Sequence, residues 1–418
     1  MCNNQDCIDI RHKDARLWQR YQREKAKTPM LFPTEGAKLL GVSELALLLA
    51  SPHSQYLGTQ CQDILTKLEQ FHELLSIVRN EHAVHEKIGR YQNLKISTNM
   101  ALMVNVGGLD LRYFINQWQH MLAISIHGNN NGNDNSNHNK PTHSLQFFDE
   151  QGNAINKIFL QSTSDDQVQK WQALIDEYAK QANTYVDIVN NVDSVNNNTD
   201  DMNTDEINDD INKDTPQEIC LKKSQQHDGD WRLQALDEKT IADFQQQWLN
   251  MNNIHQFHFI IQKLGIDRAS SYHHAPEKHA VALQVDAIEP LFQFVKEHDC
   301  PLMTFVGNTG VVQIQTGNIH HIKRTGDWIN ILDKDSTQFT LHLHDVAIAQ
   351  LWVVKRPTSD GIITCVEAFD KSGKTIVSFF GQRLEGEPEL ASWRHVTDKL
   401  IQDFAKPIAQ TAQSAHPA

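Results

Sequence analysis

The chain has 418 residues, 39% of them hydrophobic, which is enough to bury more than one core and suggests two or three domains. Its formal net charge of −14 argues against a nucleic-acid backbone as a partner. No apolar run approaches the roughly 18 residues that span a membrane, and the N-terminus has no basic region followed by an apolar core. We therefore expect a soluble, cytoplasmic protein that is not embedded in a membrane.

The first half of the chain, residues 1–186, is expected to begin with helices, pass into strands and end on a helix near Gln167–Tyr178. The DEQG sequence at 149–152 is typical of a turn that follows a strand. Residues 128–139 are rich in Asn and lie between two of the predicted strands. We expect these residues to form a disordered surface loop.

Residues 187–228 are predicted to be a linker. Between Asp187 and Glu218 there are ten acidic residues and one lysine, so about −9 of the net charge of −14 lies in this segment. The segment is rich in Asn and Asp and poor in aromatic residues. It cannot bury enough apolar surface to offset the entropy lost on ordering, so we expect it to be disordered.

The second half, residues 229–410, contains an apolar stretch from Trp248 to Arg268. Apolar side chains recur there at spacings of three and four, with an Asn cap at 252 or 253 and a Gly stop at 265, which predicts one amphipathic helix. His255 falls near the start of this helix and Arg268 just past its end. From spacing alone, such a histidine is usually a cap, a surface residue or a satisfied core group.

Strands are predicted further along the second half, at 310–317, 339–345 and 362–370, with a DKSG turn at 370–373 and a final helix at Glu389–Phe404. The six cysteines form no CxxC pair, so reduced thiols are expected, and Cys365 should be buried on a strand.

The two halves repeat each other. Residues 76–89 align with 304–317 at an offset of 228, residues 145–161 with 366–382 at an offset of 221, and residues 38–46 with 262–270 at an offset of 224. Grouped strands with helices at the ends argue for an α+β fold. We therefore predict a tandem duplication in which each half is a large antiparallel β-sheet with flanking helices.

Several motifs resemble the HemS/ChuS/HmuS family of cytoplasmic haemin-utilisation proteins. In the second half they are NNIHQF, an arginine thirteen residues after the histidine, FVGN, DWIN, KRPTSDGIITCVEAFD and FFGQRLEGEPE, and in the first half RNEHAVHEKIGRY, LDLRYFINQW and SLQFFDEQG. The resemblance covers most of the chain outside the two Asn-rich segments. It implies binding of haem b (iron protoporphyrin IX), with haem as ligand and in some members also as substrate.

The resemblance also implies roles for individual residues. His255 matches the axial ligand of the haem iron, and Arg112 matches a distal arginine that would stabilise negative charge during catalysis. The other pocket positions are Arg268 and Arg383 near the propionates, Phe305 packed on the porphyrin, Arg356 and Phe380. Relatives carry Lys at position 356, some carry Tyr at 380, and a longer amide stands where this chain has Ser378, so propionate anchoring is expected to differ here.

The duplication provides an internal comparison for the site. At the offset of 224, His255 falls opposite Leu31 and Arg268 opposite Glu44, so the first copy lacks both groups. We therefore expect one haem site per chain, where the two copies face each other.

Two functions remain open from the sequence. In the first, the protein accepts imported haem and opens its ring in an oxygenase-like reaction that releases iron. In the second, it is a non-catalytic intracellular haem carrier. A third and weaker interpretation, a scaffold without haem, predicts no spectral change on adding haemin. The resemblance implies a haem importer at the inner membrane and an electron-donating reductase as partners, and a monomer or homodimer.

Overall fold

The computed structural model describes residues 5–9, 13–126, 141–196, 218–222, 229–384 and 386–406. The predicted loop at 128–139 and most of the predicted linker lie outside these residues. The chain divides into two compact units. The first comprises residues 1–78, 86–226 and 308–312, and the second comprises residues 79–85, 227–307 and 313–418. Each unit therefore includes a short segment from the other half of the sequence, which the predicted boundaries did not anticipate.

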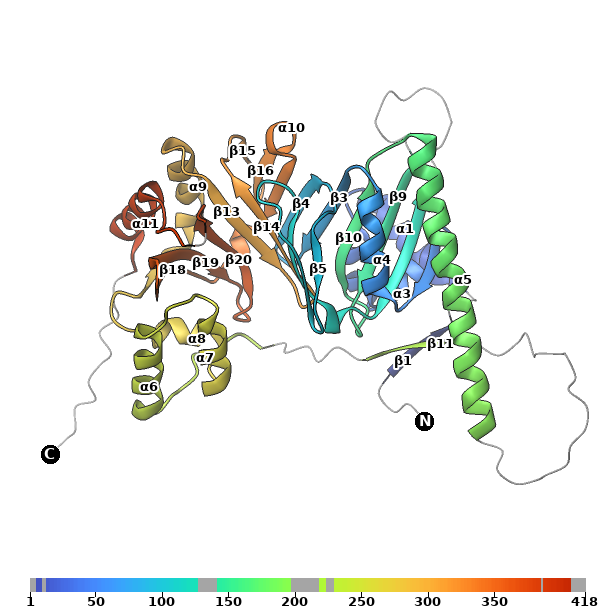
Figure 1. Ribbon diagram of the computed structural model, residues 1–418, viewed down its shortest axis with the longest axis horizontal. Helices are drawn as coiled ribbons and strands as arrows, with labels where there is room; N and C mark the ends of the chain where they lie inside the picture. The colour runs from blue at the N-terminus through green and yellow to red at the C-terminus, as the bar shows by residue number, and fades with distance from the viewer. Residues whose placement is uncertain are drawn as a thin grey trace, which may run out of the picture. The chain divides into compact units, whose positions relative to one another are not determined.

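In the described residues of the first half of the sequence, four helices precede all strands except the short β1 and β2, and a long helix follows β10, as predicted (Figure 1). The helices are α1 (Ala15–Lys27), α2 (Pro33–Leu40), α3 (Glu44–Leu49), α4 (Cys61–Lys67) and α5 (Asp165–Asn196). The strands are β1 (Gln5–Asp9), β2 (Ser54–Gly58), β3 (Leu74–Arg79), β4 (Ala83–Gly89), β5 (Leu94–Ile96), β6 (Met100–Met103), β7 (Asp110–Phe114), β8 (His120–Ile126), β9 (Thr142–Phe148), β10 (Ala154–Leu160) and β11 (Glu218–Lys222).

The main sheet of the first unit is antiparallel, with neighbouring strands in the order β3-β10-β9-β8-β2. Strands β7, β6 and β5 form a second antiparallel group. The indole of Trp171 on α5 is buried and lies edge-on to Phe71, with ring centroids 5.2 Å apart. Helix α5 therefore contributes one of the largest side chains of this core, whose packing is mainly hydrophobic.

The second half follows the same order of elements. Its helices are α6 (Glu238–Leu249), α7 (Gln256–Leu264), α8 (Arg268–His273), α9 (Ile288–Glu297), α10 (Lys334–Thr337) and α11 (Ala391–Phe404). Its strands are β12 (Ala280–Leu283), β13 (Leu302–Gly307), β14 (Val311–Gly317), β15 (Ile322–Thr325), β16 (Trp328–Asp333), β17 (Phe339–Leu343), β18 (Gln350–Thr358), β19 (Gly361–Phe369) and β20 (Thr375–Gly381).

The main sheet of the second unit is antiparallel, with the order β12-β18-β19-β20-β13. Because side chains alternate along a strand, β19 places side chains on both faces of this sheet. Val366 and Ala368 pack in the core that includes α9 and α11, whereas Cys365 and Phe369 pack in the core that includes α6, α7 and α8. The α6–α8 group covers one face of this sheet (Figure 1). The predicted α+β fold with antiparallel sheets and flanking helices is confirmed.

The duplication is confirmed in the local backbone structure. Helices α2 and α7 both end at a left-handed glycine, Gly41 with φ 70° and Gly265 with φ 66°. These two positions differ by the offset of 224. The next helix in each copy begins after a side-chain cap, which is Ser43 for α3 and Asp267 for α8. Helices α2 and α3 are therefore the counterparts of α7 and α8.

The DEQG and DKSG turns are equally alike. In each, the first aspartate accepts hydrogen bonds from backbone N–H groups two and four residues later: Asp149 at 3.0 and 2.8 Å, and Asp370 at 2.8 and 3.0 Å. Gly152 and Gly373 both have φ 78°. Glycine adopts this conformation without strain, which explains the residue type at both positions.

Two equivalent asparagines hold the segments that come from the other half of the sequence. In the second unit, the Asn80 side chain donates to the carbonyls of Gly307 and Ile376, at 3.1 and 2.8 Å. In the first unit, the Asn308 side chain donates to Ile155 O at 2.8 Å. The Trp118 indole N–H donates to Gly310 O at 2.8 Å. Each unit therefore depends on residues from both halves of the sequence.

The structure corrects two predictions. The stretch from 248 to 268 is not one helix: α6 ends at Leu249, α7 spans Gln256–Leu264, and Arg268 begins α8. The Asn252 carbonyl accepts a hydrogen bond from Ser359 N at 2.9 Å, so a contact with the β18–β19 turn holds the bend between α6 and α7. The predicted linker is also not wholly irregular, because β11 pairs with β1 and buries Ile219 and Leu221.

Candidate functional site

His255 lies at the start of α7, in an exposed position. The Gln256 side-chain oxygen accepts from the backbone N–H groups of Asn252 and Asn253, at 2.9 and 3.2 Å. The Asn253 side chain in turn accepts from His255 N at 2.8 Å. This reciprocal arrangement resembles a capping box and fixes the backbone before α7. The His255 side chain is exposed, and its imidazole has no hydrogen-bond partner among the described residues.

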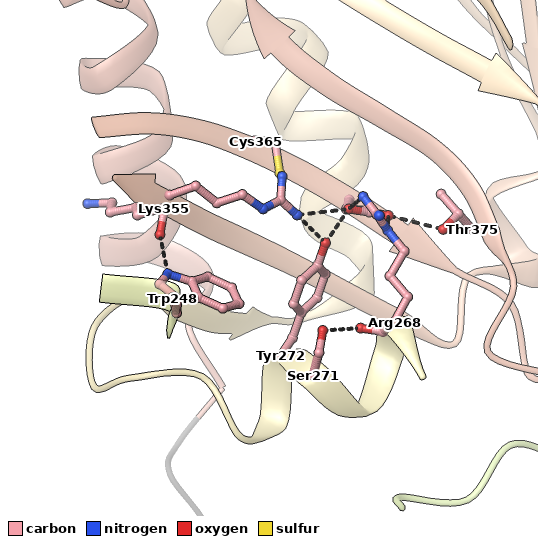
Figure 2. Close-up of polar contacts among 9 residues, drawn as sticks. Trp248, Arg268, Ser271, Tyr272, Lys355, Cys365 and Thr375 are labelled. Atoms are coloured by element: carbon pink, nitrogen blue, oxygen red, sulfur yellow. Dashed lines mark hydrogen bonds and ion pairs between the residues drawn. The ribbon is translucent and has the colours of Figure 1, made fainter. Parts of the chain in front are cut away.

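Arg268 is held by a buried carboxylate (Figure 2). Its Nε lies 2.5 Å and its Nη2 3.0 Å from the two oxygens of Glu367, whose side chain is fully buried. Tyr272 donates to Glu367 Oε2 at 2.5 Å, and Thr375 donates to Oε1 at 3.0 Å. A paired guanidinium–carboxylate contact of this kind fixes orientation as well as charge. The Arg268 side chain itself is 35% exposed.

Arg356 is buried behind Arg268. Its Nη2 donates to the Tyr272 hydroxyl at 2.6 Å and its Nη1 to Cys365 Sγ at 3.4 Å. Its guanidinium carbon lies 4.3 Å from the centre of the Phe257 ring, on α7, and that of Arg268 lies 5.3 Å from the same ring. The two predicted pocket arginines therefore meet at one aromatic side chain, only two residues after His255.

Phe305 and Phe380 lie together on the same sheet. Their ring centroids are 5.0 Å apart and both side chains are half-buried. In the strand register Phe305 faces Ser378, Ser378 faces Glu367, and Phe380 faces Cys365. Because directly opposite residues share a face, the aromatic pair lies on the face that carries Glu367. The small Ser378 therefore lies between Phe305 and Glu367, whereas Phe380 lies opposite Cys365, a contact of Arg356.

Arg383 follows β20 and pairs with the turn between β18 and β19. Its Nη2 lies 2.9 Å from Asp360 Oδ2, and its buried Nε has no partner among the described residues. Ser359, next to Asp360, is the residue whose N–H donates to Asn252 O. The β18–β19 turn therefore contacts both the segment before α7 and the segment after β20.

Arg112 belongs to the first unit. It lies on β7, opposite Leu102 on β6, and its side chain is 29% exposed. Its guanidinium donates to Asp110, which is on the same strand face two residues earlier, and to Met103 O at 3.4 Å. Burial raises the pKa of Asp110, and the charge of Arg112 opposes this shift.

The first copy lacks the corresponding groups. Glu44, the counterpart of Arg268, is the first residue of α3 and lies 2.5 Å from Lys157 Nζ, and both side chains are largely buried. Leu31, the counterpart of His255, packs against the core of α1–α3. Both copies thus have an ion pair at the start of the equivalent helix, but the cationic side chain is 35% exposed in the second copy and 13% exposed in the first.

Glu367, Tyr272 and Phe257 also belong to this cluster, and none of the three was predicted from the sequence. One signal was present: Glu367 is a charged residue within an apolar predicted strand, and at the offset of 221 its counterpart is Gln146. The comparison between copies that singled out His255 and Arg268 would also have singled out Glu367.

No cluster of three or more His, Cys, Asp or Glu residues that could hold a metal ion occurs in the described part of the chain. Within the same residues, none of the helices combines the length and the apolar character needed to cross a membrane.

The sequence and the fold were compared with those of known proteins. Residues 41–178 and 265–400 each match the family described as "Haemin-degrading HemS.ChuX domain". The chain is 28% identical over 390 residues to the hemin transport protein HmuS of Yersinia pestis, which covers 93% of this chain and 98% of that protein.

Solved structures of two proteins are similar over nearly their whole length. One is the heme degrading enzyme ChuS of Escherichia coli O157:H7, with a TM-score of 0.72 and 28% identity, covering 92% of this chain and 98% of that chain. A second structure of ChuS is described as that of an E. coli heme oxygenase. The other is PhuS, a heme-binding protein from Pseudomonas aeruginosa, with a TM-score of 0.72 and 30% identity, and coverages of 92% and 98%.

Proposed function

Because the chain belongs to the haemin-degrading HemS/ChuX-domain family, we propose that it binds haem b in its second unit and opens the ring to release iron. The observation that carries the proposal is the imidazole of His255. It is exposed, has no partner among the described residues, and lies on a backbone fixed by the Asn253–Gln256 contacts. An exposed imidazole of this kind can serve as an axial ligand for haem iron.

We assign the remaining haem contacts to four further side chains of the second unit. The half-buried rings of Phe305 and Phe380 offer an apolar surface to a porphyrin. Arg268 and Arg383 offer guanidinium groups to its two propionates. Arg356 is buried and engaged by Tyr272, so we assign it to the support of this cluster and not to direct contact.

Binding would supply the iron at which oxygen is activated, and the protein contributes ligation, orientation and charge. We propose that Arg112 stabilises the negative charge that develops during ring opening. ChuS, described as a heme oxygenase, supports the enzymatic proposal.

A non-catalytic haem carrier is the second candidate. The name of HmuS, a hemin transport protein, and the description of PhuS as a heme-binding protein favour it. So does the engagement of Arg112 by Asp110, since a guanidinium already paired with a carboxylate is less available for catalysis.

The proposal extends to the location, the oligomeric state and the partners of the protein. We infer a cytoplasmic protein, monomeric or homodimeric, that receives haem from an importer at the inner membrane and electrons from a reductase. The name of the relative HmuS, a hemin transport protein, supports the importer, and a reductase is proposed because oxygen-dependent ring opening needs an electron donor.

The deciding experiment is an absorbance time course of the purified protein with one equivalent of haemin, after adding ascorbate in air with catalase present. Catalase removes free peroxide and so limits uncoupled oxidation. Loss of the Soret band, with growth of an open-tetrapyrrole spectrum and of chelatable iron, supports the enzyme. A Soret band that persists with ascorbate and with a reductase supports the carrier, and an unchanged haemin spectrum refutes haem binding.

His255→Ala tests the ligand assignment. We expect a shifted Soret band and haemin binding weakened by at least about tenfold, because the iron loses its protein ligand. The matched control is His258→Ala, which removes a second exposed imidazole from the same helix. Normal binding by His255→Ala together with impaired binding by His258→Ala would assign the ligand to His258 instead.

A further inference from the structure

We propose that Glu367 is the positioning residue of the site, which holds Arg268 so that its outer edge meets a carboxylate of the porphyrin. The inference rests on the proposed haem function and adds a residue with no direct contact to the ligand. The Glu367 side chain is fully buried, and it binds the inner edge of Arg268 through Nε and Nη2.

The Glu367 carboxylate has no freedom to turn. Oε1 accepts from Arg268 and Thr375, and Oε2 accepts from Arg268 and Tyr272. These donors come from α8 and β20, and Glu367 itself lies on β19. Four hydrogen bonds fix the orientation of the Glu367 carboxylate. The Arg268 guanidinium is planar and pairs with this carboxylate through two parallel N–H···O bonds, so its orientation is fixed as well.

Arg268 has donors left for a ligand. Its Nε and Nη2 face Glu367, whereas its Nη1 has no hydrogen-bond partner among the described residues. The side chain is 35% exposed although its inner partner is fully buried. The Arg268 guanidinium therefore faces Glu367 in the interior with the edge formed by Nε and Nη2, and it has Nη1 left to bind an anion from solvent.

Glu367 remains an anion despite its burial. Burial alone would raise the pKa of this carboxyl group, but the charge and hydrogen bonds of Arg268 hold the pKa below its usual value. The pairing therefore persists throughout the neutral pH range. The stacking of Arg268 on Phe257 also ties the guanidinium to α7, two residues from His255.

The first copy supplies an independent comparison. At the offsets of 221 and 224, Glu367 corresponds to Gln146 and Arg268 to Glu44. Gln146 donates to Ser144, on its own strand, and Glu44 pairs with Lys157. The pairing between Arg268 and Glu367 thus occurs only in the copy that carries His255.

Glu367→Gln tests the proposal in the full chain, with haemin and its dimethyl ester as paired probes. The ester lacks the ionised carboxylates, so the ratio of the two dissociation constants measures recognition of the propionates. The unaltered protein is expected to prefer haemin. Glu367→Gln should reduce this preference by about tenfold, the lower end of the effect for supporting residues at ligand sites, while affinity for the ester stays within about twofold.

A double-variant comparison shows whether Glu367 acts through Arg268. Arg268→Gln keeps a donor for Glu367 and should also reduce the preference. Adding Glu367→Gln to Arg268→Gln should then cause no further reduction, because the two changes remove the same interaction. Glu389→Gln is the matched control: Glu389 is buried on the same unit and accepts from Thr364, and its change should leave the preference unaltered.

Three results would overturn the proposal: an unchanged preference in Glu367→Gln, an equal loss of affinity for both probes, or additive effects in the double variant. If Glu367→Gln does not fold, Glu367→Asp keeps the charge but withdraws it by one methylene and should give an intermediate preference. If the unaltered protein binds neither probe, the haem function itself fails, and that result is distinct from the three above.

Discussion

The buried ion pair of the first unit leads to a quantitative prediction for Lys157→Met. Lys157 Nζ lies 2.5 Å from Glu44 Oε1, and the two side chains are 13% and 4% exposed. Thr34 also donates to Glu44, at 2.9 Å. Removing the lysine leaves an uncompensated carboxylate in the interior, because methionine fills the space without a donor.

Breaking a buried pair by removing one partner costs about 3–5 kcal/mol. For a unit of this size, each 1 kcal/mol shifts the midpoint of thermal unfolding by roughly 2–4 °C, so we expect a fall of about 6–20 °C. Replacing Glu44 with Gln in the same protein should recover most of the loss, since the buried charge is then absent and Thr34 can still donate to the amide oxygen.

The assay is differential scanning calorimetry of the full chain, in which the two units are allowed separate transitions. Lys170→Met is the matched control. Lys170 pairs with Asp166 at 2.9 Å on α5, but both side chains are about half exposed or more, at 47% and 67%. Such helix pairs contribute about 0.3–0.5 kcal/mol. Equal shifts for Lys157→Met and Lys170→Met would refute the reasoning from burial.

Two further predictions concern titration and thiol reactivity. Burial lowers the pKa of His120 to about 4. In the unfolded chain this pKa is about 6.5, so the unfolded state binds the proton more tightly. The contribution of neutral His120 to the free energy of unfolding is therefore present above pH 6.5, and the free energy of unfolding should fall by about 2 kcal/mol by pH 5. Urea unfolding of the wild type and of His120→Gln between pH 7.5 and pH 5 measures this, and parallel curves would contradict it. Cys61, Cys300 and Cys365 are buried, and burial raises the pKa of the Cys365 thiol to about 11. Because only the thiolate is reactive, iodoacetamide at pH 8 should modify these three only after denaturation, and peptide mass spectrometry would reveal any labelling of the native protein.

The features predicted correctly from sequence are those with a local or repeated signal. The antiparallel sheets follow from strand alternation and from the DEQG and DKSG turns, whose bonds are confined to five residues. The duplication follows from matched positions such as Gly41 and Gly265, which adopt the same conformation for the same reason.

The features missed depend on contacts distant in sequence. The break between α6 and α7 is held by Ser359, more than a hundred positions after Asn252. Arg268 was assigned to the site, but its partner Glu367 is 99 positions away, and neither periodicity nor spacing links them. The separate predictions for Arg268 and Arg356 gave no sign that both stack on Phe257. The roles assigned to individual pocket residues remain predictions, which the proposed variants test.

The exchange of short segments between the two halves affects how the protein is made. The first unit includes residues 308–312, where Gly310 accepts the indole N–H of Trp118 and Asn308 binds Ile155 O. Ribosomes extend chains at about 5–20 residues per second, so the stretch from 227 to 312 takes on the order of 4–17 s. During that time the first unit lacks its final hairpin contacts. The first unit can therefore be completed only after residues 308–312 have been synthesised. A nascent chain that stalls before this point would have an incompletely folded first unit, which chaperones would have to protect.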